Sequence, residues 1–368
     1  MHVLKIVLIN LAVIFAGWMA IIVVAAAWHD WQQAGSQLDR AERVRAMLPA
    51  YSDHEEAKQI WRELKQNRRQ YASFIEWRGT ELKGKVTTVD ASGIRRHGGN
   101  RTGIELGMFG GSALWGMGVA DAQTIPAAFE RLAPAYKVTN YAEIGWNPRQ
   151  SLNLLINLIH AGTMPKTVLF YDGFNDVIAM CDPQRSTSWD GTTEENGMRE
   201  TLFRKDRGQL FDVMVRPVYD ALSRFIGAST GRLPFTCSTD PVRAQMVADG
   251  VILAWQIAHD LVVGRGGSFA AFLQPVAFLG NPRIDYLSAE VDAKTRHFDA
   301  HKKEFEAVYP LIQKRMADLP WAHDLTRAFD NDQPLFIDTV HANGTGNEII
   351  ARRMLSVVGS GQSAQASP

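Results

Sequence analysis

The sequence has little cysteine, no excess of charge of either sign and none of the glycine-rich motifs that bind nucleotide phosphates. Its 368 residues contain 39 Lys and Arg against 39 Asp and Glu, so the formal net charge is zero. Basic patches interleaved with aromatic residues are also absent, so nucleic acid is not expected as a partner. No Walker motif occurs, and no G-x-G-x-x-G follows a predicted strand.

Only two cysteines occur, Cys181 and Cys237. Two cysteines cannot complete a zinc site by themselves. In an oxidising compartment the two thiols could pair, whereas in the cytosol they would stay free. The sequence leaves both alternatives open.

One pair of histidines has the spacing of metal ligands. His297 and His301 are four residues apart on a predicted helix, and Glu304 follows three residues later. A metal site needs a third ligand and a cleft, and Glu304 has the right spacing to be that ligand. The surrounding residues, HFDAHKKEFE, are typical of a solvated charged helix face, so we expect no metal here.

The longest uncharged run lies at the amino terminus. Residues 6–28 contain no charged side chain and are long enough to cross a membrane as a helix. A secretory signal has a shorter apolar region, so a retained anchor over residues 1–28 is favoured, although Ala25-Ala26-Ala27 resembles a cleavage site. Lys5 alone precedes the span, so the positive-inside signal is weak. We expect a single-pass protein with its bulk outside the cytosol.

Residues 29–100 predict a juxtamembrane helical stalk followed by a β-rich lead-in. Residues 31–72 are polar and favour helix, with Pro49 as an interruption. We prefer helices that pack on the following domain to a free-standing stalk that binds a partner. Residues 86–90 have the composition of a strand.

From residue 101 to 358 the pattern alternates between strand and helix. Strands are predicted at 103–109, 136–144, 167–171, 268–273 and 334–337, and helices at 121–132, 151–161, 240–263 and 346–358. Strands separated by helices favour a parallel sheet with helices on both faces, which is a three-layer α/β/α fold. Residues 181–237 interrupt this pattern as a predicted insertion with an amphipathic helix at 209–226, and residues 359–368 predict a flexible tail.

Two glycines and a serine follow the first of these strands, in Phe109-Gly-Gly-Ser112. This order places a hydroxyl at the carboxyl edge of the sheet, where ligands bind in open α/β folds. The following helix supplies backbone N–H groups near Ser112. A Gly-Ser pair alone is more often a simple loop, and the sequence does not fit the G-x-S-x-G elbow.

Two later strand ends carry candidate hydrogen-bond donors. Asn175 follows the strand at 167–171 and can donate to a developing oxyanion, although an Asx-turn that caps the strand is an equally good interpretation. Gly145 follows the strand at 136–144, and its N–H could be a further donor. A plain turn glycine is the alternative there.

Near the carboxyl end, Asp338 and His341 are three residues apart. Within one turn the carboxylate can fix the imidazole tautomer and stabilise the imidazolium. His341 would then act as general base to Ser112. A lone D-x-x-H is often a surface ion pair, but this one follows a predicted strand and precedes a helix.

Taken together and in this order, these segments resemble the sequence blocks of the SGNH hydrolase superfamily, which includes the GDSL-like enzymes. By this resemblance, Ser112 matches the nucleophile of block I, Gly145 block II, Asn175 the G-x-N-D of block III, and Asp338 with His341 block V. The resemblance covers about 103–180 and 245–357. The chain departs from the pattern in block I, where Gly110-Gly111-Ser112 replaces Gly-Asp-Ser.

The resemblance implies a flavodoxin-like α/β/α fold and an oxyanion hole made of the Ser112 N–H, the Gly145 N–H and the Asn175 side chain. It implies acyl transfer without a metal or an organic cofactor: Ser112 attacks an ester, His341 moves the proton, and water releases the acyl group. It also implies a bacterial member, and therefore an inner-membrane anchor through residues 6–28 with the catalytic domain in the periplasm.

We therefore expect a carboxyl-ester hydrolase that acts on an ester-bearing substrate, with an acylated envelope or extracellular glycan as the candidate. The glycan is inferred from the membrane location and the habits of the family. One alternative is O-acetyl transfer to a polysaccharide, where a sugar hydroxyl replaces water. Another is a non-catalytic envelope or polysaccharide-assembly subunit, which is disfavoured because every triad and oxyanion position is filled. A lipase with 209–226 as its lid ranks third, and the oligomeric state is open.

Overall fold

The computed structural model describes residues 38–99, 102–182, 235–291, 295 and 297–365, together with 5–6, 9–10, 13–15 and 17–21. The described residues up to Ile21 belong to one compact unit, and those from Leu38 onward belong to another. In the first unit the described residues are helical, and Ile6, Ile9 and Ile21 are exposed. The anchor predicted over 6–28 lies partly outside the described residues and stays a prediction. The predicted insertion lies outside them from 183 to 234, including the helix at 209–226.

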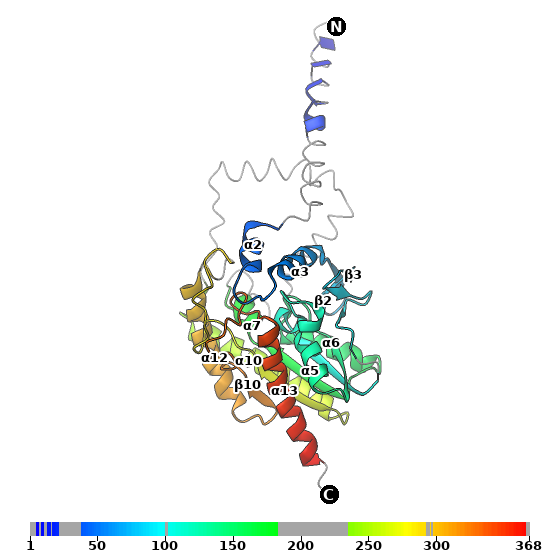
Figure 1. The fold of residues 1–368 in the computed structure, drawn as a ribbon, viewed down its shortest axis with the longest axis vertical. Helices are drawn as coiled ribbons and strands as arrows, with labels where there is room; N and C mark the ends of the chain where they lie inside the picture. Colours follow the sequence, from blue (N-terminus) through cyan, green and yellow to red (C-terminus); the bar gives the residue numbers. More distant parts are fainter. Residues whose placement is uncertain are drawn as a thin grey trace. The chain divides into compact units, whose positions relative to one another are not determined.

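The second unit is built on a five-stranded parallel sheet (Figure 1). Its strands are β6 (Ile104–Gly110), β7 (Tyr136–Asn140), β8 (Thr167–Asp172), β9 (Ser268–Leu273) and β10 (Ala322–Asp324). They lie in the order β10-β9-β8-β6-β7. Counted along the chain, this is the 2-1-3-4-5 order of flavodoxin-like folds. The predicted fold class, a parallel α/β sheet with helices on both faces, is confirmed.

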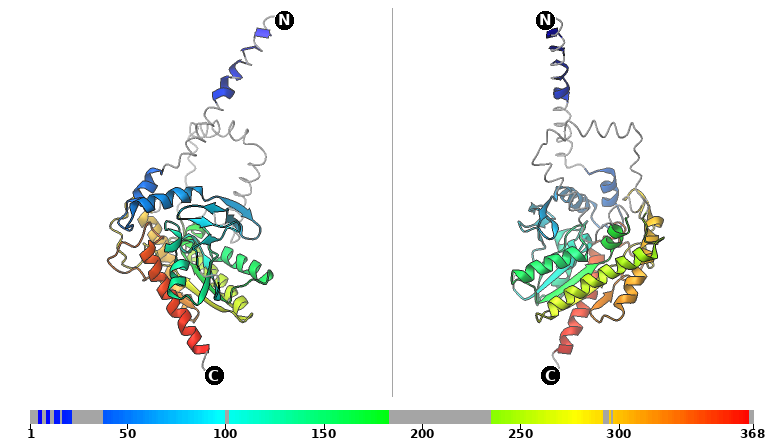
Figure 2. Two further views of the ribbon diagram at one scale, coloured as in Figure 1. Left: turned by 45° about the vertical axis from the view of Figure 1, so that its right-hand side comes forward. Right: turned by 180° about the vertical axis from the view of Figure 1, so that it is seen from behind.

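Helices cover both faces of this sheet. One face carries α4 (Ser112–Trp115), η1 (Asp121–Gln123), α5 (Ile125–Leu132) and α13 (Gly344–Gln365). The other carries α6 (Pro148–His160), α7 (Phe174–Met180), α10 (Pro241–Val263) and α12 (Phe298–Met316), and Figure 2 shows α6 and α10 side by side on it. Successive strand residues alternate between the two cores: Phe109 packs with α10, whereas Met108 packs with α5 and α13. The predicted three layers follow from this alternation.

One described helix, α10, is long and apolar enough to cross a membrane, with 23 residues and a mean hydropathy of 1.4. It packs against α6, α12 and β9, and it buries Val247, Val251 and Trp255 in the core. Its apolar composition is that of a core helix.

The lead-in is part of the same unit. Its elements are α2 (Arg40–Ala46), α3 (His54–Gln66), β1 (Arg69–Ala72), β2 (Glu76–Gly79), β3 (Leu82–Lys83), β4 (Thr88–Val89) and β5 (Arg95–Arg96), which form two small antiparallel sheets, β1-β2 and β3-β4-β5. The predicted helical segment 31–72 is too long, because β1 begins at Arg69. Trp61 of α3 packs against Ile337, and the Tyr51 hydroxyl donates to the backbone oxygen of Gly118 at 2.8 Å.

Three further details differ from the sequence-based expectations. Residues 334–337 are not a sheet strand, because only an isolated bridge joins Phe336 to Ala342. The last strand is the three-residue β10, whose His323 and Asp324 give no apolar signal. Helix α13 continues through Gln365, into the predicted tail.

The two cysteines form a disulfide. Cys181 and Cys237 are bonded across 56 positions of sequence, and both lie in the core beside α7 and α10. The structure therefore decides between the two alternatives that the sequence left open.

Candidate active site

Ser112 lies at the carboxyl end of β6, on the first turn of α4. The N-cap of α4 is Gly111, and the Ser112 side chain is almost fully buried, with 8% of the residue exposed. β6 is the strand at which the order of the sheet reverses, with β7 on one side and β8 on the other. Ligand sites of open α/β sheets lie at this reversal point, outside the carboxyl ends of the strands.

Asp338 and His341 lie on a tight turn between β10 and α13. The turn is closed by the Ile337 N–H, which donates to the His341 backbone oxygen at 2.8 Å. Asp338 Oδ1 accepts the N–H groups of Val340 at 2.9 Å and His341 at 2.8 Å, so the carboxylate also shapes its own turn. The backbone oxygen of Thr339 accepts the N–H of Ala277, which ties the turn to the segment after β9.

The three predicted triad side chains form one continuous hydrogen-bonded chain. His341 Nδ1 lies 2.6 Å from Asp338 Oδ2, and His341 Nε2 lies 2.7 Å from Ser112 Oγ. If Nδ1–H donates to the carboxylate, Nε2 is the acceptor for the Ser112 hydroxyl. Asp338 and His341 are 3% and 5% exposed, so this chain lies in a low-dielectric environment where its electrostatic interactions are strong. The arrangement can activate a serine hydroxyl as a nucleophile.

Asn175 lies on the first turn of α7, directly after β8. Its side-chain nitrogen donates to the backbone oxygen of Trp146 at 2.7 Å. A Cβ atom at Gly111 would collide with this nitrogen and lie 2.9 Å from the Trp146 oxygen. Asn175 is therefore packed against the turn that carries Ser112. A carboxamide has two N–H bonds, so one donor is left after the bond to Trp146.

Gly145 lies in the loop after β7, with a φ of +86° that favours glycine. Within the described part of the chain, no hydrogen bond is made by the N–H groups of Ser112 or Gly145. The loop is bound to β6, since the Glu143 N–H donates to the Gly110 oxygen at 3.1 Å. The segments that carry Ser112, Gly145 and Asn175 thus meet at one edge of the sheet.

Sequence reasoning missed the residues of the lead-in that support this edge. Arg95 of β5 is fully buried, and it donates to the backbone oxygens of Trp115, Gly116 and Val119 while its guanidinium lies 4.3 Å from the Trp115 ring. Burial lowers the pKa of this guanidinium, and the carboxylate of Asp121 at 2.9 Å opposes that effect. Arg95 therefore holds the chain that leaves α4 directly after the serine.

Two carboxyl groups are buried close behind Asn175. Asp172 ends β8 and accepts the Trp255 indole N–H at 2.9 Å, while its other oxygen has no partner among the described residues. Burial raises the pKa of Asp176 to about 7 and raises the pKa of Asp172 well above its usual range, with the neighbouring Asp176 adding to the effect on Asp172. Both carboxyl groups, Asp172 at the end of β8 and Asp176 in α7, therefore hold their protons to a higher pH than an exposed aspartate does.

The predicted solvated face at the start of α12 is only partly right, because His297, the N-cap of the helix, is exposed but two of the other residues are buried. His301 and Glu304 are 7% and 2% exposed, because α12 turns this side toward α10 and the disulfide. Glu304 accepts hydrogen bonds from the N–H and the hydroxyl of Ser238. Glu304 also lies close to Cys181 and Cys237, but both sulfur atoms are committed to the disulfide.

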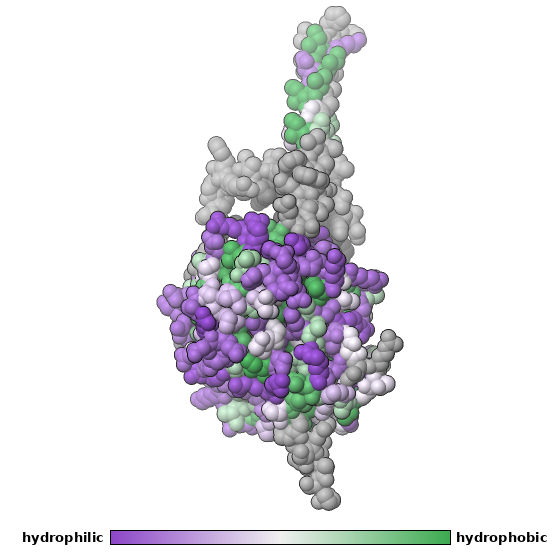
Figure 3. Space-filling view, in the orientation of Figure 1, coloured by the Kyte–Doolittle hydropathy of each residue, from purple (hydrophilic) through white to green (hydrophobic). Residues whose placement is uncertain are grey.

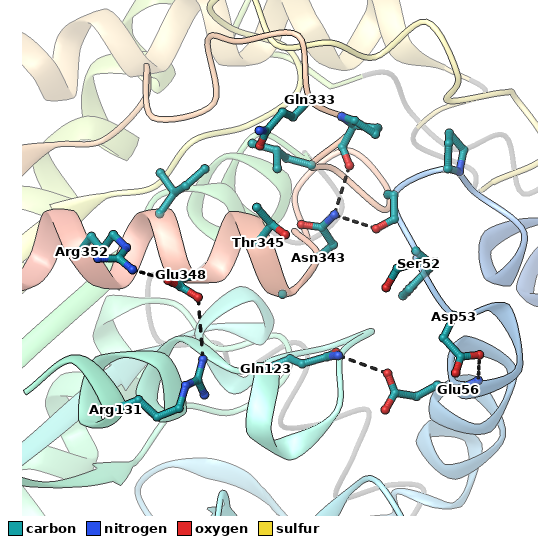
Figure 4. Close-up of a pocket in the computed structure, with 17 residues that line it drawn as sticks. Ser52, Asp53, Glu56, Gln123, Arg131, Gln333, Asn343, Thr345, Glu348 and Arg352 are labelled. Carbon is teal, nitrogen blue, oxygen red and sulfur yellow. Dashed lines mark hydrogen bonds and ion pairs between the residues drawn. The ribbon is translucent and has the colours of Figure 1, made fainter. Parts of the chain in front are cut away.

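A separate hollow lies elsewhere among the described residues. It has a volume of about 790 Å³ and is bordered by α3, α5 and α13 (Figure 4). Ser112, Asp338 and His341 do not line it. Glu348 of α13 pairs with Arg352 of the same helix at 2.5 Å and lies 4.0 Å from Arg131 of α5. The molecular face in Figure 3 is mainly hydrophilic, with small scattered apolar areas.

No protein-family model matches the chain, and no curated protein matches it. Among solved structures, 46 chains match. They include a lipolytic protein of the G-D-S-L family from Veillonella parvula, at 14% identity and a TM-score of 0.36 over 69% of this chain and 97% of that chain. They also include a carbohydrate acetylesterase from Sinorhizobium meliloti, at 11% identity and a TM-score of 0.38 over 70% of this chain and 98% of that chain.

A third match is the catalytic domain of peptidoglycan O-acetyltransferase A from Streptococcus pneumoniae, at 11% identity and a TM-score of 0.34 over 72% of this chain and 97% of that chain. The fold class is established by the strand order described above.

Proposed function

We propose that the chain is a serine esterase in which Ser112 is the nucleophile, His341 the general base and acid, and Asp338 the group that orients His341. The observation that carries the proposal is the hydrogen-bonded chain of 2.7 Å and 2.6 Å that joins the three side chains across 229 positions of sequence. Hydrophobic packing alone would not bury a serine hydroxyl, an imidazole and a carboxylate in one hydrogen-bonded chain.

In the proposed reaction, Ser112 Oγ attacks the ester carbonyl carbon as its proton moves to His341 Nε2. The N–H groups of Ser112 and Gly145 and the free N–H of Asn175 donate to the oxyanion. His341 then passes the proton to the leaving alkoxide, the carbon–oxygen bond breaks, and the alcohol departs. Water repeats the sequence on the acyl-enzyme, which releases the carboxylic acid and restores the Ser112 hydroxyl.

We further propose that this domain works outside the cytosol, on the periplasmic side of an inner membrane. The Cys181–Cys237 disulfide supports this location, because structural disulfides persist in oxidising compartments. The uncharged run over residues 6–28 supports an anchor. An acylated envelope glycan stays a prediction that depends on this location.

The test is turnover of para-nitrophenyl acetate by the full chain in detergent, with Ser112→Ala beside it. We expect the variant to lose roughly 10³-fold or more of kcat. Ser268→Ala is the matched control, since Ser268 begins β9 at the opposite edge of the sheet, and it should keep the wild-type rate. Mass spectrometry of the quenched reaction should find an acetyl group on Ser112.

Equal rates in the wild type and Ser112→Ala would refute the esterase proposal. Transfer is distinguished by product analysis with an added oligosaccharide acceptor. Acetylated sugar in place of free acetate would assign the same acyl-enzyme to an O-acetyltransferase.

A further inference from the structure

The loop that carries Gly145 is held by a strand of the lead-in. Arg78 of β2 donates to the backbone oxygens of Tyr141 at 2.9 Å and Ala142 at 3.3 Å. Its guanidinium also lies 5.0 Å from the Trp146 ring centre, and Arg78 is only 5% exposed. β2 therefore contacts both ends of the loop between β7 and α6.

The neighbouring Trp77 contacts the middle of the loop. Its indole Nε1 donates to the backbone oxygen of Ile144 at 3.0 Å, and its own backbone oxygen accepts the Trp146 indole N–H at 3.2 Å. A Cβ atom at position 145 would lie 3.3 Å from the Trp77 ring, so Gly145 rests directly against the indole. Trp77 is 2% exposed.

The bond to Ile144 determines where the Gly145 N–H points. The Ile144 oxygen and the Gly145 N–H belong to one planar trans peptide, so they point in opposite directions. An indole donor on the oxygen therefore directs the N–H away from Trp77. Glycine at φ +86° does not by itself prevent rotation of this peptide, so the orientation depends on outside contacts.

Glu143 provides a second contact of the same kind. Its Oε1 accepts the Ile144 N–H at 2.9 Å, and its Oε2 accepts the Gly79 N–H of β2 at 2.7 Å. The residue is fully buried, and the Arg78 guanidinium provides the opposite charge. The peptide groups on both sides of Ile144 are thus fixed against β2.

We propose that Trp77 is a positioning residue for ester hydrolysis, in which its indole N–H holds the Ile144–Gly145 peptide so that the Gly145 N–H faces the oxyanion. The inference rests on the proposed function, because it needs an oxyanion at Ser112. It makes the lead-in a part of the active site, whereas the sequence alone separates residues 29–100 from the catalytic domain.

The test replaces the donor and keeps an aromatic ring, with Trp77→Phe in the full-length protein. The matched control is Trp321→Phe, because Trp321 directly precedes β10 at the opposite edge of the sheet. Both variants are assayed on para-nitrophenyl acetate and on its thionoester analogue, in which sulfur replaces the carbonyl oxygen. Thermal unfolding of each variant reports on the fold.

The Gly145 N–H stabilises the substrate's carbonyl oxygen mainly when negative charge develops on it in the transition state. For Trp77→Phe we therefore expect kcat to fall by about 10- to 100-fold while KM stays unchanged. Sulfur accepts hydrogen bonds weakly, so the thionoester rate should change far less and the preference for the oxygen ester should shrink. Trp321→Phe should keep both the rate and the preference. A Trp77→Phe enzyme with the wild-type kcat and preference would overturn the inference, and so would an equal loss on both substrates.

Glu143→Gln keeps the inference testable if Trp77→Phe does not fold. Each carboxylate oxygen of Glu143 accepts one N–H, whereas the glutamine amide has only one oxygen that can accept. The contact to Gly79 or to Ile144 is therefore lost, and we expect the same fall in kcat and in the preference for the oxygen ester. Wild-type turnover that depends on Ser112, together with unaffected variants, would reject only the role of Trp77. Turnover independent of Ser112 would reject the esterase and this role together.

Discussion

The side-chain nitrogen of Asn175 donates a 2.7 Å hydrogen bond to the backbone oxygen of Trp146, and so joins the helix after β8 to the loop after β7. β6 lies between these two strands, so the bond passes over the turn that carries Ser112. Gly111 leaves room for it, since a Cβ atom there would meet both partners. The active-site edge is therefore braced across the point where the strand order reverses.

This arrangement predicts that Gly111→Ala damages catalysis through Asn175. The new methyl group would displace the carboxamide, and we expect kcat to fall by about 10²-fold, in the range found when one oxyanion donor is lost. Steady-state kinetics with para-nitrophenyl acetate provides the measurement.

The control for this prediction is a double-mutant cycle with Asn175→Ala. If Gly111→Ala acts by displacing Asn175, the two changes together should cost little more than Asn175→Ala alone. Fully additive losses would show that Gly111→Ala acts by another route.

Asp338→Asn tests the orientation of His341. The amide would offer an N–H where the carboxylate accepts one, so the ring would lose the tautomer that leaves Nε2 free to accept the Ser112 proton. We expect a loss of roughly 10³- to 10⁴-fold in kcat with little change in KM. Asp330→Asn, at a carboxylate that accepts the Asn281 N–H away from the triad, is the matched control. A small effect of Asp338→Asn would contradict the assigned role.

The sequence predicted the ends of β6, β8 and β9 closely because these central strands have clear patterns, whereas the strand predicted over 136–144 continues past the end of β7 at Asn140. All six residues of β8 are buried, and the apolar run over 168–171 within it is easy to find between polar segments. The three-residue β10 has no such pattern, and the apolar residues at 335–337 are buried in a turn instead of a strand. Burial alone does not distinguish a strand from a tightly packed turn.

The site was predictable only in part, for the same physical reason. Asp338 and His341 are three residues apart, so their contact is local, whereas the contact between His341 and Ser112 spans 229 positions and was inferred from the order of the motifs. Trp77 and Arg95 act on backbone oxygens of distant loops. Such contacts join residues far apart in the sequence, so they leave no characteristic spacing in it.

The disulfide should contribute to stability. Cys181 ends α7 and Cys237 precedes α10, and their bond closes a long loop. Loss of such a cross-link is expected to lower the free energy of unfolding by about 2–4 kcal/mol. Denaturant unfolding with and without reductant measures this, and the Cys181→Ala/Cys237→Ala double variant should not respond to reductant. An identical midpoint for the reduced and oxidised wild type would contradict the prediction.

Asp176 predicts how stability depends on pH. Burial raises its pKa from 3.8 to about 7 in the folded protein, so the folded state keeps a proton that the unfolded chain releases near pH 4. Stability is therefore highest below pH 4 for this group and falls as the pH rises to about 7, by at most about 1.4 kcal/mol per pH unit. Asp172 acts in the same direction, since its pKa is also raised by burial.

Asp176→Asn isolates this contribution, because the amide has no proton to lose in this range. Between pH 4 and pH 7 the wild type should lose stability relative to the variant, and above pH 7 the difference should become constant. Asp318→Asn, at an exposed position after α12, should follow the wild type at every pH. The measurement is the unfolding midpoint of each protein across this pH range. If the stability difference between the wild type and Asp176→Asn does not change with pH, or changes in favour of the wild type as the pH rises, the buried carboxyl is already ionised in the folded protein.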